Sequence, residues 1–170
     1  TANIPALVIL LPLCSALPCL ALTKVNRHLG NAIVKIACLG SFVLSVIQLI
    51  EVVKNGPVHY AIGNYAVPYG IELVIDSLNA VLLVAFSLIG FMTLIFAGNF
   101  GDRKRPMMIA AANAEIALLI TGLLGMTSTG DVFNLYVFLE ITSLSAYCLI
   151  SLGGSRGVVS AYRYMLVGTI

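Results

Sequence analysis

The chain has 170 residues, of which 60% are hydrophobic and only 9% are Asp, Glu, Lys or Arg, and its mean hydropathy is +1.05. A soluble domain of this size does not carry such a composition on its surface, so the sequence predicts an integral membrane protein. The formal net charge of +2 arises from basic residues that are scattered along the chain. This scatter excludes nucleic-acid binding, which requires a basic stripe.

The long apolar segments predict an all-α membrane protein. A spanning helix needs about 20 mostly apolar residues, whereas the strands of a membrane barrel show about 10 alternating ones. The first helix contains Pro12 and Pro18, which are expected to kink it, and without a basic leader it is expected to be retained. The predicted spans are residues 6–22, 32–53, 77–98, 107–126 and 132–152, and a sixth helix, residues 158–170, is too short to span.

Basic residues gather in the loops at one end of the predicted helices. Lys35 and Arg163 lie one turn inside the same end and are expected to anchor their helices, whereas the opposite end carries only Lys54. By the positive-inside rule the basic end is cytoplasmic and the N-terminus is outside. The basic loop residues are Lys24, Arg27, Arg103, Lys104, Arg105 and Arg156.

Residues 54–76 are too polar to span the membrane. Turn signals occur at residues 56–57, 63–64 and 68–70, and the segments 58–62 and 71–75 resemble short strands. We therefore predict a short β-hairpin on the outer surface, between the second and third helices. The chain has no internal repeat, so residues 1–170 are expected to form a single membrane domain.

Glu140 is the only carboxylate within the fifth span, and Glu115 is the only one within the fourth. Both lie nine or ten residues from a helix end, so each is about 14 to 15 Å deep, near the middle of a core about 30 Å thick. The two helices are antiparallel neighbours because only residues 127–130 join them. The carboxylates are therefore placed either to share a proton or cation, or to face different directions.

A charge at this depth is costly unless it is protonated, paired or hydrated, so we interpret Glu140 as functional. Loss of solvation favours the protonated form of a carboxyl group, and a nearby cation favours the ionised form, which is the basis of a coupled proton relay. Glu115, among small residues, is either part of an ion pathway or half of a structural pair with another subunit. Tyr136, Ser143 and Tyr147 share the face of Glu140, where packing between helices is favoured over hydrogen bonding to the acid or ordering of a water chain.

Asp131 and Asp76 each precede a predicted helix at the outer end. Their first role is expected to be N-terminal capping, with collection of cations at an outer mouth as the alternative. No metal or other cofactor is expected. The four cysteines lie in apolar runs without paired short spacings and are expected to be small core residues, and His28 and His59 fall in predicted loops rather than forming a haem-ligand pair.

Residues 129–140, Thr-Gly-Asp-Val-Phe-Asn-Leu-Tyr-Val-Phe-Leu-Glu, followed by Ser-Ala-Tyr-Cys-Leu-Ile at 145–150, carry a family resemblance. They resemble the fifth-helix signature of the antiporter-like subunits of Mrp cation/proton antiporters, membrane-bound hydrogenases and respiratory complex I, most of all the Mrp D-type branch. Residues 63–65, Gly-Asn-Tyr, followed by residues 68–76 resemble the outer hairpin that leads into the third helix. Residues 161–168 resemble the start of the sixth. The resemblance extends over essentially the whole chain.

The resemblance implies that Glu140 is the fifth-helix glutamate, which in this family works with a lysine on the seventh helix. The chain ends before that helix and corresponds to about a third of a usual subunit. The implied partners are therefore other membrane subunits, including a chain that supplies the later helices, together with H⁺ or Na⁺ and the lipids of a prokaryotic cell membrane. The chain is not expected to be catalytic by itself, although its complex is either an antiporter or an ion-pumping oxidoreductase.

Three functional hypotheses follow from these residues. The leading one is an ion-translocating membrane subunit in which Glu140 titrates. The second is a structural subunit that only docks its neighbours and has no ion pathway of its own. The third, an electron carrier that handles quinone or haem, is weakest because the sequence has no pair of haem ligands.

Overall fold

The computed structural model describes residues 3–62, 70–100 and 106–168. The five longest helices are each long and apolar enough to cross a membrane, as predicted. The turn predicted at residues 63–64 and 68–69, the basic residues 103–105 and the end of the last predicted helix lie outside the described residues. In chain order the elements are α1 (Ile4–Thr23), α2 (Arg27–Asn55), β1 (Val58–Ala61), β2 (Glu72–Ile75), α3 (Ser77–Phe100), α4 (Pro106–Ser128), α5 (Val132–Ser151) and α6 (Ser155–Gly168).

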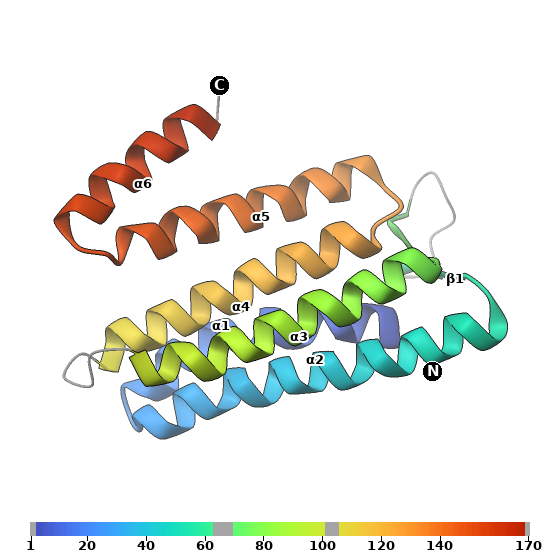
Figure 1. Ribbon diagram of the computed structural model, residues 1–170, viewed down its shortest axis with the longest axis horizontal. Coiled ribbons are helices and arrows are strands. Elements are labelled where there is room, and N and C mark those ends of the chain that lie inside the picture. The colour runs from blue at the N-terminus through green and yellow to red at the C-terminus, as the bar shows by residue number, and fades with distance from the viewer. Residues whose placement is uncertain (1–2, 63–69, 101–105, 169–170) are drawn as a thin grey trace.

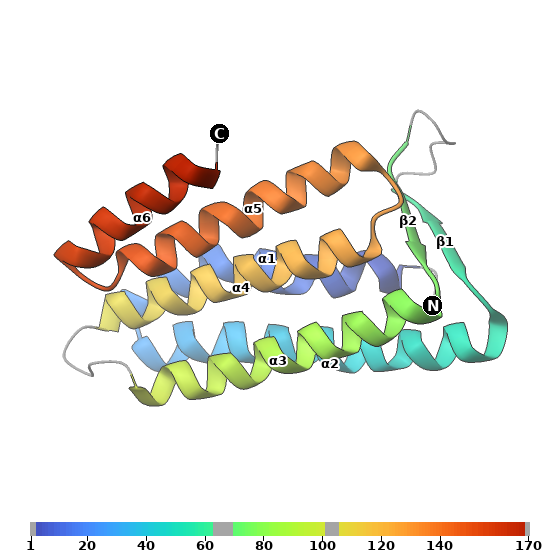
Figure 2. The ribbon, with the colours of Figure 1, turned by 45° about the horizontal axis from the view of Figure 1, so that its top comes forward.

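Helices α1 to α4 form a bundle in which α1 and α3 each pack against both α2 and α4 (Figure 1). Most of the buried apolar residues, such as Val34, Leu83 and Leu124, lie inside this bundle. Helix α5 packs on the outside of α4, and α6 folds back along α5 (Figure 2). The buried residues of α5 are only Asn134 and Ser145, so α5 and α6 form an outer layer on a self-contained bundle.

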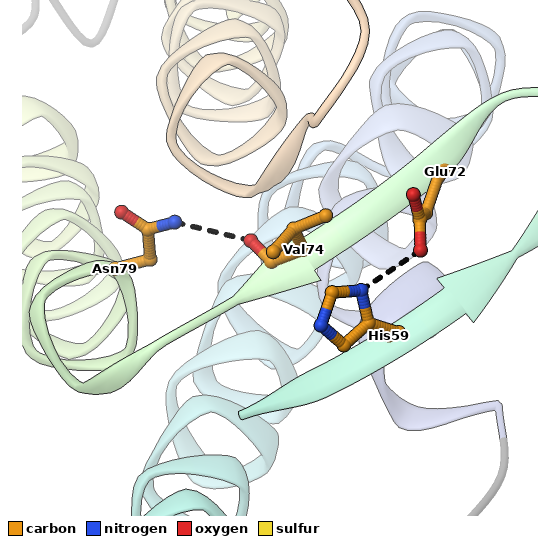
Figure 3. A network of polar contacts seen from close by, with 4 residues as sticks. All are labelled: His59, Glu72, Val74 and Asn79. Atoms are coloured by element: carbon orange, nitrogen blue, oxygen red, sulfur yellow. Dashed lines mark hydrogen bonds and ion pairs between the residues drawn. The ribbon is translucent and has the colours of Figure 1, made fainter. Parts of the chain in front are cut away.

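The predicted hairpin is present at one end of the bundle, which we call the hairpin end; the opposite end, where α1 ends and α2 begins, we call the basic end (Figure 2). Strands β1 and β2 are antiparallel, with His59 opposite Val74 and Ala61 opposite Glu72. His59 Nδ1 and Glu72 Oε1 lie 2.8 Å apart across the pair, and Asn79 of α3 donates from Nδ2 to the Val74 carbonyl at 3.0 Å (Figure 3). The first contact holds the two strands together, and the second joins the hairpin to the start of α3.

The hairpin also holds the connection between α4 and α5. The Gly130 amide donates to the Glu72 carbonyl at 2.9 Å, and Thr129 forms a β-bridge with Leu73, which is buried. A Cβ at Gly130 would meet the Val74 side chain at 2.7 Å, so this close approach requires glycine. The start of α5 is therefore fixed by β2 as well as by α4.

Two predicted helix starts are wrong. Helix α2 begins at Arg27 rather than residue 32, because the Asn26 side chain caps it by accepting the His28 amide at 2.9 Å. His28 therefore lies in the first turn of a helix and not in a loop. Helix α6 begins at Ser155 rather than residue 158, directly after Gly154, whose positive φ of 84° suits glycine.

Glycine lets α4 and α5 approach closely. A Cβ at Gly122 would overlap the Thr142 hydroxyl and would lie 2.9 Å from the Phe138 carbonyl, and a Cβ at Gly125 would overlap the Phe138 ring. The Thr142 hydroxyl donates to the Phe138 carbonyl at 2.8 Å, which holds it in place. Small residues at such contacts let backbones approach within a membrane, where packing drives helix association.

Substitution of Gly122 by alanine is predicted to destabilise the protein, by about 1 to 3 kcal/mol, because the added methyl group overlaps groups that cannot move freely. The matched control is Gly40→Ala, where the nearest group to a Cβ is the end of the flexible Leu11 side chain at 3.2 Å. Because alanine has a higher helix propensity than glycine, Gly40→Ala is expected to leave the free energy of unfolding unchanged or to raise it by up to about 1 kcal/mol. Unfolding in detergent micelles measures both, and equal stability of the two variants would contradict the close α4–α5 contact.

Candidate functional site

Glu140 lies near the middle of α5, nine residues after the capping residue Asp131 and about 14 Å along the helix. The Asp131 carboxylate accepts the amides of Phe133 at 3.3 Å and Asn134 at 3.2 Å. Asn134 in turn donates from Nδ2 to the Thr129 hydroxyl at 3.0 Å. The start of α5 is thus held by its own polar side chains, and the Glu140 side chain is half-buried.

Glu140 is on the side of α5 that faces away from α4. Phe138 and Thr142, which contact Gly122 and Gly125, are two residues before and two residues after Glu140. Two residues correspond to about 200° around an α-helix, so both place Glu140 on the opposite face. Glu140 therefore takes no part in the contact that α5 makes with Gly122 and Gly125 of α4.

Glu115 is on the side of α4 that faces α5. It precedes Gly122 by seven residues, which is about two turns, so the two share one face of the helix. Its carboxylate lies within electrostatic range of the Cys148 thiol of α5. Glu115 therefore lies on the side of α4 that faces α5, whereas Glu140 lies on the far side of α5.

The three polar neighbours predicted for Glu140 differ in their contacts. The Tyr136 hydroxyl, one turn before Glu140, lies within hydrogen-bonding reach of its carboxylate. The Ser143 hydroxyl donates instead to the Leu139 carbonyl of its own helix at 2.9 Å. Tyr147 packs edge-to-face on Tyr164 of α6, with ring centroids 5.1 Å apart. Only Tyr136 is directly associated with the acid.

The face that contains Glu140 is largely uncovered. Helix α6 lies beside the basic-end part of α5, where Tyr147 meets it (Figures 1 and 2). Nearer the hairpin end, Tyr136 is 60% exposed and Phe133 is 71% exposed. Exposure of large side chains to this extent indicates a surface that contacts lipid or another protein segment.

Asp76, like Asp131, caps a helix, accepting the Asn79 amide at 2.8 Å at the start of α3. Within residues 3–62, 70–100 and 106–168, no three His, Cys, Asp or Glu side chains are grouped as a metal site. Cys19 and Cys38 are buried as expected, but the prediction of core positions is wrong for Cys14 and Cys148, which are exposed. Exposed thiols are tolerated at Cys14 and Cys148 because a thiol has low polarity and the outer surfaces of α1 and α5 are apolar.

The sequence did not single out the buried amides of the bundle. Gln48 of α2 is 1% exposed, and within the described part of the chain neither of its amide atoms has a hydrogen-bond partner. Asn113 of α4 is fully buried and donates from Nδ2 to Asn31 Oδ1 of α2 at 3.0 Å. An amide side chain inside an apolar helix was the available signal, since such groups hydrogen-bond across membrane helices.

Comparisons with known proteins show that the chain is similar to the N-terminal part of antiporter-like membrane subunits. No family model matches it. It is 39% identical, over 99% of its length, to NADH-quinone oxidoreductase subunit N of Desulforudis audaxviator, and 31% identical, over 91%, to the D-type subunit of the Na(+)/H(+) antiporter of Bacillus subtilis. A chain in the structure of the membrane-bound sulfane sulfur reductase, an archaeal respiratory membrane complex, superposes with a TM-score of 0.86 at 29% identity over 98% of this chain.

These relatives confirm the resemblance to the Mrp and complex I-like subunits. The chain is homologous to their N-terminal portion. It spans about a third of their length, namely 34% of the oxidoreductase subunit, 31% of the antiporter subunit and 34% of the reductase chain. It is a multi-pass membrane protein whose relatives belong to multisubunit complexes.

The separation of the two acids predicts a crosslinking pattern. In a background with Cys14, Cys19 and Cys38 replaced by alanine, Glu115→Cys is expected to be linked to native Cys148 by a short bifunctional thiol reagent. When Cys148 is also replaced by alanine, Glu115→Cys and Glu140→Cys are expected to remain unlinked, because they lie on opposite sides of α5. Mass spectrometry of the digested protein reads out both pairs, and efficient linkage of the second pair would contradict the placement of Glu140.

Proposed function

We propose that this chain forms the N-terminal part of a proton- or sodium-translocating membrane subunit, in which Glu140 is the titrating group. The complex is an Mrp-type antiporter or an ion-pumping respiratory or hydrogenase complex, in keeping with the names of its relatives. The observation that carries the proposal is a half-buried carboxylate near the middle of a membrane-spanning helix, on a face turned away from the bundle. Such a group is costly in a bilayer and is commonly functional.

The surroundings of Glu140 support exchange between its two protonation states. A carboxyl group in an apolar environment favours the protonated form, and an approaching cation favours the ionised form. The Tyr136 hydroxyl lies within hydrogen-bonding reach of the Glu140 carboxylate. Movement of a cation on a neighbouring element then loads or releases the proton. Glu115, which lies towards Cys148, is a second candidate on a separate path at the α4–α5 contact.

The cation that works with Glu140 is expected on another segment of the complex. The chain spans about a third of its relatives, and the exposed face around Phe133 and Tyr136 offers a surface for the later helices. We infer that residues 1–170 act as one membrane domain in a prokaryotic cell membrane. The basic end then faces the cytoplasm, and the hairpin and N-terminus face outside.

The alternative is a structural role, in which the chain docks its neighbours without an ion pathway of its own. The feature in its favour is the close helix packing at Gly122 and Gly125, which holds α5 as a rigid outer surface. In that case Glu140 would be dispensable for transport, and only changes at the packing contacts would matter.

Glu140→Gln is predicted to reduce ion transport by the assembled complex in membrane vesicles at least about 100-fold, which is the lower end of the range for loss of a proton-transfer group. The matched control is Glu51→Gln, the same chemical change in α2, four residues from its hairpin-end terminus. The control is expected to retain transport.

Assembly of each variant complex is measured in parallel by its recovery as an intact complex. Full transport by an assembled Glu140→Gln complex would refute the proposal and support the structural alternative. Loss of transport by both variants to the same extent would also refute a specific role of Glu140.

A further inference from the structure

A cavity of about 410 Å³ lies at the basic end, between the first turns of α2 and α4. Its volume is within the range of about 300 to 1,000 Å³ that is usual for small-molecule sites. Arg27, Asn31 and Lys35 of α2 line it at successive intervals of four residues, and thus form one stripe along the helix. The opposite wall is formed by Pro106 and Ile109 of α4.

The cavity concentrates positive charge. Arg27 donates from Nε to His28 Nε2 at 3.4 Å, so both side chains lie together at the mouth. Lys35 is half-buried, about 12 Å along α2 from Arg27. In the part of the chain that the structure describes, no carboxylate forms an ion pair with either of these cations. An anion in the cavity would supply the missing counter-charge.

One amide side chain, that of Asn31, lines the cavity. Asn31 Oδ1 accepts the hydrogen bond from buried Asn113 Nδ2 at 3.0 Å, which leaves the Asn31 amide nitrogen as a donor for a ligand. Asn113 lies one turn deeper in α4 than Ile109. The cavity therefore combines cationic groups and an amide donor with the apolar side chains of Ala32 and Ile109.

We propose that this cavity binds the phosphate group of an anionic phospholipid. Arginine and lysine side chains with additional N–H donors are the usual ligands of phosphate, and arginine matches its oxygens in pairs. Arg27 and Pro106 are the first residues of their helices, so the mouth lies where the spans meet the headgroups. Basic pockets between membrane helices recognise anionic headgroups in this position, and the apolar wall suits the glycerol and the start of an acyl chain. Glu140 and ion translocation have no part in this inference.

The test is a titration of the purified chain in neutral detergent, followed by native mass spectrometry. The probes are phosphatidylglycerol, phosphatidylcholine and inorganic phosphate. The double variant Arg27→Gln, Lys35→Gln removes two cations of the cavity, and Lys24→Gln, Lys54→Gln removes two that do not line it. The unmodified chain is expected to bind phosphatidylglycerol at least about tenfold more tightly than phosphatidylcholine.

The cavity variant is expected to bind phosphatidylglycerol about 25-fold more weakly, on the basis of about fivefold for each cation near the membrane surface. The control variant is expected to retain the affinity of the unmodified chain. If the double variant does not fold, Arg27→Gln alone is expected to lose about fivefold and Lys35→Arg to retain binding.

Equal losses in both double variants would overturn the proposal, because binding would then follow overall charge. Binding of inorganic phosphate without a preference for phosphatidylglycerol would overturn the lipid as the source of the phosphate. Absence of binding to all three probes would overturn the site, and would leave an acidic segment of a neighbouring subunit as the counter-charge.

Discussion

The close contact between α4 and α5 at Gly122 and Gly125 determines how the rest of the molecule is presented. In a membrane the lipid is as apolar as the side chains, so helices associate through packing rather than through burial from water. Gly122 brings α4 against Thr142 and Phe138, and this contact selects one face of α5 as the inner face. Glu140 is directed away from α4 as a geometric consequence.

Helices α1 to α4 and helices α5 and α6 differ in how many of their side chains are buried. Helices α1 to α4 bury an apolar core and hydrogen-bond one another through Ser45 and Ser87, whose hydroxyls are 2.9 Å apart. Helices α5 and α6 bury few residues and expose large side chains such as Phe133. The chain spans about a third of the length of its relatives, and α5 and α6 form its more exposed side.

Much of the fold follows from the sequence because the length of each apolar segment predicts the length of its helix. The short strand-like segments between turn residues predict the hairpin. The predicted start of α2 is wrong because a polar first turn, capped by Asn26, resembles a loop. The position of Glu140 along α5 is predictable from its distance to Asp131. Its direction is not, because helical spacing gives the angle between residues but not which face meets a neighbour. That choice depends on Gly122, whose role is visible only when the two helices are placed together.

The most direct measurement of the role of Glu140 is infrared difference spectroscopy of the assembled complex as an ion gradient is applied. If Glu140 changes protonation during transport, a carboxyl C=O band responds to the gradient and is lost in Glu140→Gln, while it persists in Glu51→Gln. A responsive band that survives in Glu140→Gln, or no responsive band in a complex that transports ions, would contradict Glu140 as the titrating group.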